Sequence, residues 1–434
     1  MTRAVRTPAA ARTAPAAQDT VVGETLAGDT LTAEVLPPGA FPSAAEFPGP
    51  QRPTTVWEDL RWWRFTARTD LHETRFLRIR DQGRTVAMAP LLITRRAGGL
   101  LFYDPPRLAG SEGAMAEPDL LDEPERERWR TLTARTDQAR DEQYPSLALA
   151  TFGNHPGVVH DPARTAAQRA AVWAALPRLV ARAAEELGCR SSALLYAGDA
   201  QRDAADTSAT AHGHQRVLLG AEGVLHLTAS SNEEYVAGLS SRRRTRLRRE
   251  VREYQKAGFR TVVREGPGAL DDEVIALQVA HRAKYGLPGG EARVRRDFEA
   301  TAQEMGEDCL VLGAERDGRL HGFLLHLRTP DALYARTAGF APDADGCYLA
   351  LTYHETAGWA AEHGIRRVHY GLASYEAKRA RGCDLEPRWG WFAFGGSGRD
   401  AYEELLRLQS LTIERRLELV GAPTAPPAPS GERA

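Results

Sequence analysis

The 434-residue sequence predicts an α/β protein made of two similar halves, each a mixed sheet flanked by helices. Strand-like and helix-like segments alternate along most of the chain, which is typical of this class. The length suits about two domains of ordinary size. Two segments also resemble one another, because FLRIRDQGRTVAMAPLLI (76–93) and LVLGAERDGRLHGFLLHL (310–327) share a strand, a Gly-Arg turn and an apolar strand. Such a repeat indicates duplication of one supersecondary unit.

The composition excludes several classes of protein. Hydrophobic residues make up 42% of the chain and charged residues 26%, which is enough for a globular core. No run of about 18 apolar residues exists, so we expect no membrane-spanning helix. Residues 1–20 have no apolar h-region, so we expect no secretory signal. Four widely separated cysteines without a CxxC pair argue against a disulfide framework or a zinc knuckle and favour the cytoplasm.

The two ends are expected to be disordered, at residues 1–20 and 421–434, because Ala, Pro, Thr and Arg dominate them. We therefore place an N-terminal domain at 21–228 and a C-terminal domain at 229–420. Six prolines between Pro37 and Pro53 predict an irregular segment within the first domain.

The first half is expected to contain a hairpin whose turn is Asp81-Gln82-Gly83-Arg84, a sequence that favours tight turns between strands. A later Ala-rich segment predicts a long helix with a kink at Pro177. In chain order, the expected elements are a tryptophan-rich helix at 56–66, strands at 76–80, 85–94 and 101–103, a helix at 165–187, and strands at 192–196 and 217–227.

The second half has clearer boundary signals. Gly258 and Gly364 are typical of helix ends, and Asp271 and Asp272 suit the positive start of a helix. In chain order, the expected elements are a helix at 240–256, a strand at 260–264, helices at 270–285 and 293–305, strands at 309–316, 320–328 and 332–339, a helix at 348–363, strands at 367–370 and 389–394, and a helix at 400–419.

The helix predicted at 240–256 is strongly basic. Residues 242–256 read RRRTRLRREVREYQK, with eight basic and two acidic residues in a chain of net charge -2. Leu247, Val251 and Tyr254 fall on one stripe that faces the core, so the arginines lie on the other faces. They form either an ordinary solvated surface or a site for a phosphate-rich partner, RNA or a pyrophosphate. Arginines at a helix start oppose the helix dipole, which favours the functional interpretation.

A second cluster follows the strand predicted at 367–370. Gly371 ends that strand, and a short polar helix then carries Lys378 and Arg381 three residues apart. Loops after strand ends bind ligands in α/β sheets, so we expect an anionic ligand here unless the pair is only surface charge. Tyr334 and Arg336 point to the same side of their strand. An arginine on a buried side needs an anionic partner, whereas on an outer side it would mean little.

Other familiar kinds of catalysis lack support. The segment Gly395-Gly396-Ser397-Gly398 does not match a nucleophile elbow, because Arg399 stands where glycine is needed. Phosphate-loop and dinucleotide fingerprints are absent. His212 and His214 form a close pair without a nearby third ligand, so we expect no metal site.

Several segments together resemble the tandem acetyltransferase-fold (GNAT) family that includes the Fem aminoacyltransferases and the N-acyltransferases of peptidoglycan biosynthesis or recognition. The resemblance covers about 230–420 in sequence and 55–200 in architecture, and it implies two GNAT-like domains. The final segment resembles the family signature Gly-x(5-6)-Lys-x-x-Arg-Gly-Phe-x-Pro, with Cys383 where the family has an aromatic or apolar residue. The matching segments are SSRRRTRLRREVREYQKAGF (240–259), ERDGRLHGFLLHL (315–327), LYARTAG (333–339) and YGLASYEAKRARGCDLEP (370–387).

The resemblance implies transfer of an acyl group to an amine, from aminoacyl-tRNA in Fem enzymes and from acyl-CoA in ordinary GNAT enzymes. Where GNAT enzymes bind pyrophosphate, this chain has FAPDADGC (340–347), whose acidic residues and lack of a glycine pair suit pyrophosphate poorly. We therefore expect a cytoplasmic aminoacyltransferase that acts on an amine of a cell-wall precursor or natural-product intermediate, without a cofactor, a metal ion or integral membrane association. The alternatives are acyl-CoA-dependent N-acetylation and a non-catalytic protein that binds cell-wall precursors.

In this reaction, peptide N–H groups of strand 332–339 would stabilise the oxyanion, and Tyr370, His354 or water would remove the amine proton. The catalytic candidates are Tyr334, Arg336, His354 and Tyr370; the substrate-binding candidates are Tyr375, Lys378, Arg381 and Gly382; the tRNA-binding candidates are Arg242, Arg243, Arg244, Arg246 and Arg249.

Overall fold

The structure is a computed structural model, and it describes residues 31–49, 53, 55–69, 71–113, 116–284, 290–344 and 346–422. The tail predicted at 1–20 lies outside these residues. So does the tail predicted at 421–434, except for Gly421 and Ala422.

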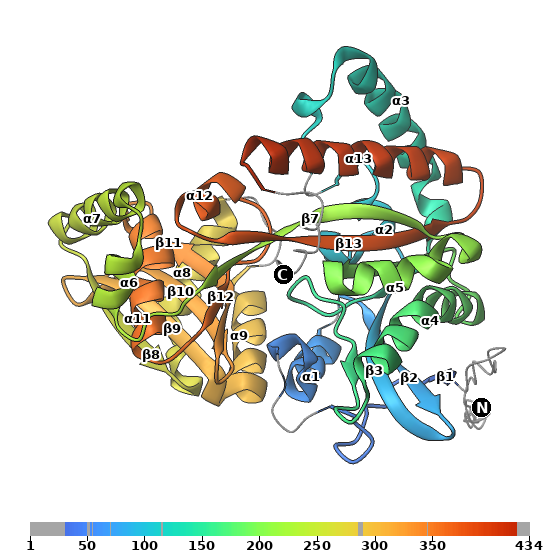
Figure 1. Ribbon diagram of the computed structural model, residues 1–434, viewed down its shortest axis with the longest axis horizontal. Helices are drawn as coiled ribbons and strands as arrows, with labels where there is room; N and C mark the ends of the chain where they lie inside the picture. The colour runs from blue at the N-terminus through green and yellow to red at the C-terminus, as the bar shows by residue number, and fades with distance from the viewer. Residues whose placement is uncertain are drawn as a thin grey trace, which may run out of the picture.

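A continuous mixed sheet runs through the described residues (Figure 1). Its strand order is β1-β2-β3-β4-β6-β13-β7-β12-β11-β10-β9-β8, and β5 pairs with β3 off this path. Two neighbouring pairs are parallel, β4 with β6 and β11 with β12. The strands are β1 (Leu31–Val35), β2 (Glu73–Asp81), β3 (Arg84–Thr94), β4 (Ser146–Leu149), β5 (Val159–His160), β6 (Ser191–Ala197), β7 (Gln215–His226), β8 (Arg260–Glu265), β9 (Cys309–Arg316), β10 (Arg319–Arg328), β11 (Ala332–Phe340), β12 (Arg367–His369) and β13 (Asp384–Phe394).

Helices pack on this sheet and connect its strands. The α-helices are α1 (Leu60–Arg68), α2 (Pro105–Leu108), α3 (Glu123–Ala139), α4 (Ala166–Glu186), α5 (Asp199–Ala209), α6 (Asn232–Gly238), α7 (Ser241–Lys256), α8 (Asp272–Lys284), α9 (Glu291–Met305), α10 (Cys347–Leu349), α11 (Thr356–Glu362), α12 (Tyr375–Ala380) and α13 (Arg399–Leu419). A π-helical segment, η8 (Ala350–Glu355), joins α10 to α11. No described helix is long and apolar enough to cross a membrane.

The two halves share one order of elements. In each half an antiparallel hairpin leads to a third strand, and a helical crossover then returns to a parallel fourth strand. In the first half these strands are β2, β3, β4 and β6 with crossover α4, and in the second half they are β9, β10, β11 and β12 with crossover α10–α11. The hairpin turns correspond as well, because Gly83 and Gly318 both have positive φ, 80° and 74°.

The long strands β7 and β13 join the halves (Figure 1). β7 pairs with β12 at its C-terminal end and with β13 along the rest of its length, and β13 also pairs with β6. Helix α13 then packs on α3 through an apolar cluster that includes Leu132 and Leu405. Residues 384–419 therefore pack with the first half. If residues 384–419 are added to the first half, a division of the chain into two domains near residue 228 remains our proposal.

Two predicted elements of the first half differ in the structure. Residues 101–103 form a 3-10 helix, η2, and not a strand. The reason is that Pro105 and Pro106 follow, because proline cannot donate to a sheet ladder and favours the first turn of a helix, here α2. The helix predicted at 56–66 is divided into a 3-10 turn, η1 (Val56–Glu58), and α1, because the Asp59 side chain accepts a hydrogen bond from the Arg61 N–H (2.8 Å) and caps α1.

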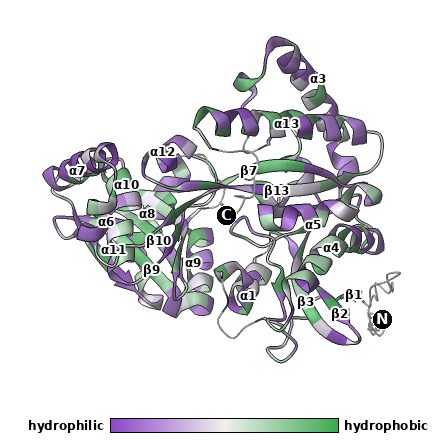
Figure 2. Ribbon diagram, viewed as in Figure 1, coloured by the Kyte–Doolittle hydropathy of each residue, from purple (hydrophilic) through white to green (hydrophobic). Residues whose placement is uncertain are grey.

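The main apolar core spans both halves. Trp57, Trp62 and Phe65 of the first half belong to the same buried cluster as Phe298 and Tyr334 of the second. Figure 2 shows that hydrophobic residues dominate β9 and β10, whereas hydrophilic residues cover much of α3 and α7 at two ends of the molecule.

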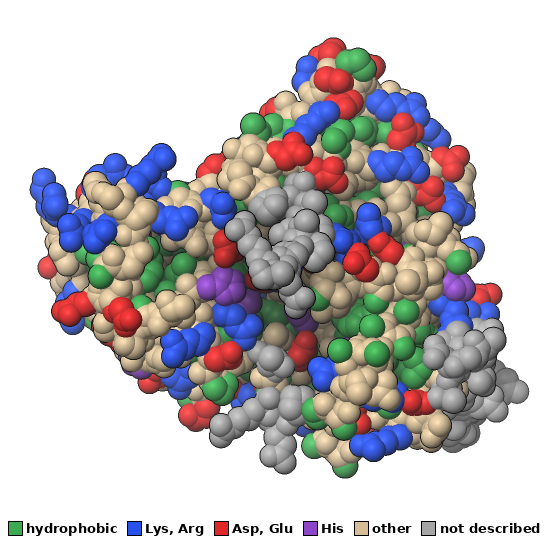
Figure 3. All heavy atoms as spheres, in the orientation of Figure 1, with side chains coloured by type: hydrophobic (Ala, Val, Ile, Leu, Met, Phe, Trp, Pro, Cys, Tyr) green, Lys and Arg blue, Asp and Glu red, His purple; other side chains and the backbone are tan. Residues whose placement is uncertain are grey.

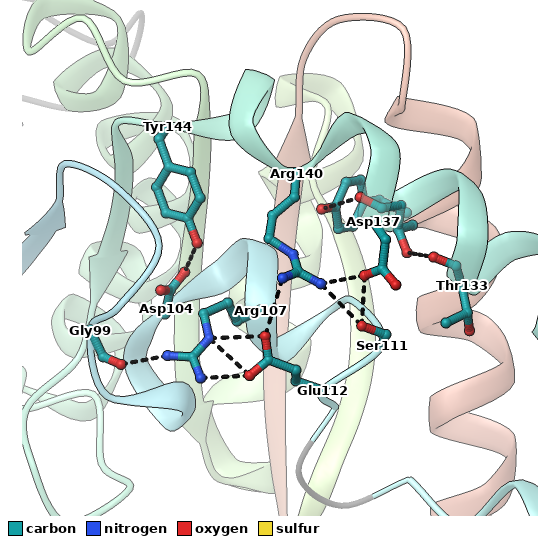
Figure 4. Close-up of polar contacts among 11 residues, drawn as sticks. Gly99, Asp104, Arg107, Ser111, Glu112, Thr133, Asp137, Arg140 and Tyr144 are labelled. Carbon is teal, nitrogen blue, oxygen red and sulfur yellow. Dashed lines mark hydrogen bonds and ion pairs between the residues drawn. The ribbon is translucent and has the colours of Figure 1, made fainter. Parts of the chain in front are cut away.

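A polar network holds α2, α3 and the turn after α3 together (Figure 4). Arg107 donates to the Gly99 carbonyl oxygen (2.7 Å) and pairs with Glu112, which also lies near Arg140. Tyr144 donates to Asp104 (2.7 Å), whose pKa burial raises to about 6. The network fixes the segment that leads from η2 into α2, and Tyr103 of η2 lies in one cavity lining with Arg336 of the second half.

Candidate active site

The parallel strands β11 and β12 separate in the middle of the sheet. They pair at Ala332 with Arg367, Leu333 with Val368, and Tyr334 with His369. β12 ends at His369, whereas β11 continues to Phe340. Alternate peptide groups of β11 beyond Tyr334 therefore have no strand partner on that side. Ligands commonly bind where strands of an open sheet part in this way.

A cavity of about 330 Å³ lies at this point and is lined by both halves of the chain. The second half contributes Ala335, Arg336, His369 and Gly371, at the ends of β11 and β12. The first half contributes an aromatic wall that includes Trp57, Phe65, Phe102, Tyr103 and Phe152. This volume lies within the usual range for small-molecule sites. We call it the active-site cavity.

Tyr334 lies beside this cavity and is almost completely buried. Its ring stacks on His369 at 4.5 Å between centroids and meets Trp57 edge-on at 5.4 Å. Burial raises the pKa of the Tyr334 hydroxyl well above its ordinary value, so the side chain stays neutral. Its position suits it to orienting His369.

Arg336 lines the cavity together with Ala335, at a β-bulge of β11 where Ala335 pairs with His326 and Thr337 with Leu325. Its guanidinium lies 5.4 Å from the centre of the Trp62 ring, and burial lowers its pKa. Arg282 and Arg293 line the same cavity, together with the carboxylate of Asp297, which lies 3.6 Å from Arg293 Nε. Three guanidinium groups against two lining carboxylates, Asp297 and Glu222, suit an anionic part of a ligand.

His369 forms the centre of an arrangement that the sequence did not predict. Its Nδ1 lies 3.3 Å from Glu222 Oε1, and neither ring nitrogen makes a hydrogen bond of good geometry among the described residues. Burial alone would raise the pKa of the Glu222 carboxyl, but Arg388 and His369 lower it well below its usual range. An imidazole backed by an ionised carboxylate is the usual arrangement of a general base.

Tyr370 lies on the opposite face of the sheet, because neighbouring residues of a strand alternate. Its ring packs 4.9 Å from Tyr353, and its buried hydroxyl has no hydrogen-bond partner among the described residues. Burial raises the pKa of this hydroxyl well above its ordinary value.

His354 and Arg381 lie on the same side as Tyr370, around the carboxylate of Glu250 on α7. His354 Nε2 lies 2.7 Å from Glu250 Oε2, and Arg381 donates to both oxygens, at 2.6 and 3.1 Å. All three residues are at least 90% buried. Burial lowers the pKa of His354, although Glu250 opposes this effect. The three residues form a buried ion cluster that joins α7 to η8 and to the end of α12.

Lys378 and Tyr375 organise the turn from β12 into α12. Lys378 is 3% exposed, and its Nζ donates to the carbonyl oxygens of Gly371 (2.6 Å) and Leu372 (2.9 Å). The Tyr375 hydroxyl accepts a hydrogen bond from the Ala221 N–H (3.1 Å). Gly382 has φ of 103°, which favours glycine, and ends the same motif. Because Gly371 lines the active-site cavity, these residues shape its edge.

Helix α7 has the two faces that its sequence predicts. Leu247 and Tyr254 are buried, and so is Glu250, which the apolar stripe did not reveal. Three predicted RNA-binding residues instead donate to backbone carbonyl oxygens: Arg243 to Arg379, Arg244 to Leu239, and Arg246 to Ala380. Arg242 and Arg249 are exposed, and Figure 3 shows basic side chains gathered over α7.

No group of three His, Cys, Asp or Glu side chains in the described part of the chain is placed to hold a metal ion.

Comparison with known proteins places this geometry in a context. A family model named FemAB-like, described as peptidoglycan biosynthesis/recognition, matches residues 135–416. No curated protein matches the sequence. Among solved structures, FemX is similar, with 10% identity, a TM-score of 0.50, and 81% of this chain and 94% of that chain covered. This likeness confirms the predicted fold class.

Two further structures show weaker likeness. A tandem GNAT protein from the clavulanic acid biosynthesis pathway is 15% identical, with a TM-score of 0.46 over 85% of this chain and 99% of that one. The C-terminal domain of a putative lysylphosphatidylglycerol synthetase from Agrobacterium fabrum is 16% identical, with a TM-score of 0.44 over 63% of this chain and 83% of that one.

Proposed function

The chain belongs to the FemAB-like family of peptidoglycan biosynthesis or recognition, and from this we propose that it is an N-acyltransferase that forms an amide bond. The donor in this proposal is an aminoacyl-tRNA, and the acceptor is an amine of a cell-wall precursor or of a natural-product intermediate. The observation that carries the proposal is the cavity where β11 parts from β12, because it combines unpaired peptide groups with the imidazole of His369.

The proposed step is attack of a neutral amine nitrogen on the ester carbonyl carbon. The C–N bond forms as the carbonyl π electrons move to oxygen, where N–H groups of β11 beyond Tyr334 stabilise the charge. His369 Nε2 takes the proton that the amine loses, and Glu222 stabilises the resulting imidazolium through Nδ1. Collapse breaks the ester C–O bond, and the departing ribose oxygen takes the proton from His369.

The charged surroundings have separate roles in this proposal. Arg336 and its neighbours Arg282 and Arg293 hold an anionic part of the substrate inside the cavity. The exposed arginines of α7 contact the RNA backbone outside it. Lys378 acts through the backbone, because its ammonium fixes the Gly371 and Leu372 carbonyls at the cavity edge.

The loop after β11 supports tRNA rather than CoA as the donor. The Asp343 carboxylate in this loop forms an ion pair with Arg316 (2.6 Å) and lies 3.1 Å from His321 Nδ1. A carboxylate in this place repels a pyrophosphate.

The test is incubation of the purified protein with a pool of charged tRNA and a nucleotide-linked muramyl peptide, with products identified by mass spectrometry. We expect a product heavier than the acceptor by one amino-acid residue, and its formation should stop after ribonuclease treatment. A parallel reaction with acetyl-CoA serves as the comparison. A ribonuclease-insensitive acetylated product would support CoA as the donor, and precursor binding without any turnover would support a recognition protein.

A further inference from the structure

The first half contains a cavity of its own, of about 520 Å³. It lies near the C-terminal ends of β4 and β6, the parallel pair that corresponds to β11 and β12. Its lining includes Glu58, His155, Trp173, Tyr196, Asp199 and Arg388. We call it the N-terminal cavity.

A thin wall separates the N-terminal cavity from the active-site cavity. Trp57 and Asn154 line the active-site cavity, whereas the next residue in each case, Glu58 or His155, lines the N-terminal cavity. The ion pair of Glu222 with Arg388 completes the wall, because each partner lines a different cavity. The two cavities are thus adjacent and correspond in topology.

Glu58 is the unusual group in the N-terminal cavity, because it has no ion pair with a lysine or arginine among the described residues. His155 Nε2 lies 3.9 Å from its carboxylate. Burial lowers the pKa of His155 to about 3, so the ring is neutral near pH 7. Its Nδ1 accepts a hydrogen bond from the Gly157 N–H (3.0 Å). His155 therefore offers Glu58 no positive charge.

The single arginine of the lining does not neutralise Glu58 either. Arg388 pairs with Glu222 and with Glu386 (3.1 Å). Asp199 pairs with Arg202 (3.2 Å) and Glu386 with Arg388, so Glu58 is the carboxylate of this lining that has no guanidinium partner among the described residues. A cation that enters the cavity would therefore stabilise the ionised form of Glu58.

The remaining lining suits an organic cation with an alkyl stem. The aromatic side chains of Trp173 and Tyr196 lie in the same cavity as Glu58. Aromatic faces attract ammonium groups and provide apolar contact for methylene groups. A cavity of this volume also has room for a ligand larger than a single ion.

We infer that the N-terminal cavity binds the primary ammonium group of an alkylamine, with Glu58 as its ion partner. Binding is a property of the cavity alone.

The test is isothermal titration of the parent protein with Nα-acetyl-lysine amide and with its Nε-acetylated form, which lacks the positive charge. We expect the charged probe to bind at least tenfold more tightly, because a charge-assisted contact contributes about ten- to a hundredfold in affinity. Glu58→Gln should lose that difference, whereas Glu127→Gln, at an exposed position of α3, should keep it.

A second variant tests the cavity independently, in case Glu58→Gln does not fold. Ala200 lies exposed at the rim of the cavity on α5, so Ala200→Trp should block entry without altering Glu58. It should abolish binding of the charged probe while the melting temperature stays near that of the parent. Equal binding of both probes, no binding of either, or unchanged binding by Glu58→Gln would overturn the inference. Because titration needs no tRNA and no turnover, failure of the transfer reaction would leave this result unaffected.

Discussion

A reactive side chain and a structural one can be neighbours in the sequence, as His369 and Tyr370 show. His369 faces the active-site cavity, and Tyr370, the next residue, packs among apolar side chains on the other face of the sheet. Glu222 reaches His369 from a different strand, β7, and is held ionised by Arg388. The proposed base thus depends on a contact between the strand that joins the halves and the end of β12.

His369→Asn should abolish most transfer activity. Asparagine keeps the approximate size of the ring but cannot take up a proton, and general base catalysis typically contributes about 10²–10⁴-fold in rate. We expect a loss of that order in kcat, measured with saturating donor, and a melting temperature close to that of the parent. His363→Asn is the control, because His363 is exposed at the end of α11. Transfer by His369→Asn at the parent rate would exclude His369 as the base.

Glu58 should make the stability of the protein depend on pH. Burial raises its pKa from 4.5 to about 7 in the folded state. The folded protein therefore keeps a proton that the unfolded chain releases, so the free energy of unfolding falls as pH rises from about 4.5 to about 7. Above that window the penalty is roughly 2–3 kcal/mol. The other titratable or charged groups of the same cavity are His155, His160, Asp199, Glu386 and Arg388.

Urea unfolding of the parent and of Glu58→Gln at pH 4.5, 6 and 8 measures this effect. The variant should be more stable than the parent at pH 8 and nearly equal to it at pH 4.5. A difference between the two proteins that stays constant across this range would show that Glu58 has an ordinary pKa in the folded state.

At this scale the sequence predicted part of the site. Tyr334 and Arg336 could be singled out because they lie two residues apart on one strand. Arg336 lines the active-site cavity, and Tyr334 stacks on His369, which also lines it. His369, Glu222 and Glu58 were missed because their significance lies in contacts between distant segments. The structure places His354, Tyr370 and Arg381 on the other side of the sheet from the active-site cavity. Their role in catalysis or substrate binding remains a prediction.

Among the elements, α7 combines an internal ion cluster with an external basic face. Its buried side carries Glu250, and the side chains of His354 and Arg381 converge on that carboxylate from η8 and from the end of α12. Its exposed side carries Arg242, Arg249, Arg252 and Lys256, which lie on one side of the helix because they are spaced three, four and seven residues apart. The first side positions the helix, and the second is available to a partner.

Glu250→Ala should be strongly destabilising. Removing one member of a buried ion cluster leaves uncompensated charge, which typically costs about 3–5 kcal/mol. Glu253→Ala on the same helix is the matched control, because the Glu253 side chain is 61% exposed, and it should change stability by no more than about 0.5 kcal/mol. Chemical unfolding of both variants measures the difference. Equal effects would show that Glu250 contributes no more than an ordinary surface residue.

The outer face of α7 should bind RNA. Arg242→Glu, Arg249→Glu and Arg252→Glu together should weaken tRNA binding and reduce the slope of log affinity against log salt by about 0.7–0.9 for each lost phosphate contact. Arg243 and Arg246 are left intact, because they contact α12. A triple reversal with the same change in net charge, Arg84, Arg135 and Arg407 to Glu, is the control at exposed positions elsewhere. Equal affinity and salt slope for both triple variants would exclude α7 as the RNA site.

Elements with strong local signals were predicted well, and those set by distant contacts were not. The hairpins around Gly83 and Gly318 and the basic helix α7 were predicted from their own residues. η2 is an exception: the local signal of Pro105 and Pro106 is present in the sequence and favours a helix start, so the predicted strand is wrong. β13 is longer than predicted, since its polar first half is held by pairing with β7.

At the scale of the whole molecule, the chain is two similar units, and its last strand and helix pack with the first of them. β13 lies between β6 and β7, although more than 150 residues separate β7 from β13 in the sequence. The buried side chains Trp391, Phe392 and Tyr402 complete cores of the first half. This arrangement could not be predicted from composition or periodicity, because a sequence pattern does not specify which edge a distant strand will join.

The N-terminal unit should therefore require the C-terminal end of the chain in order to fold. A fragment that ends at residue 228 keeps β6 and β7 but lacks their shared partner β13, and it exposes the apolar face on which α13 packs. Val224 pairs with Asp384 in antiparallel register, so a turn of about 2–5 residues can join His226 to Asp384 and make β7 and β13 a hairpin. We expect the joined chain, residues 31–226 followed by 384–422, to unfold in a single cooperative transition in urea, monitored by circular dichroism. The fragment ending at 228 should show no such transition. A fragment that unfolds as cooperatively as the joined chain would show that 21–228 is a complete domain and that β13 and α13 only cover it.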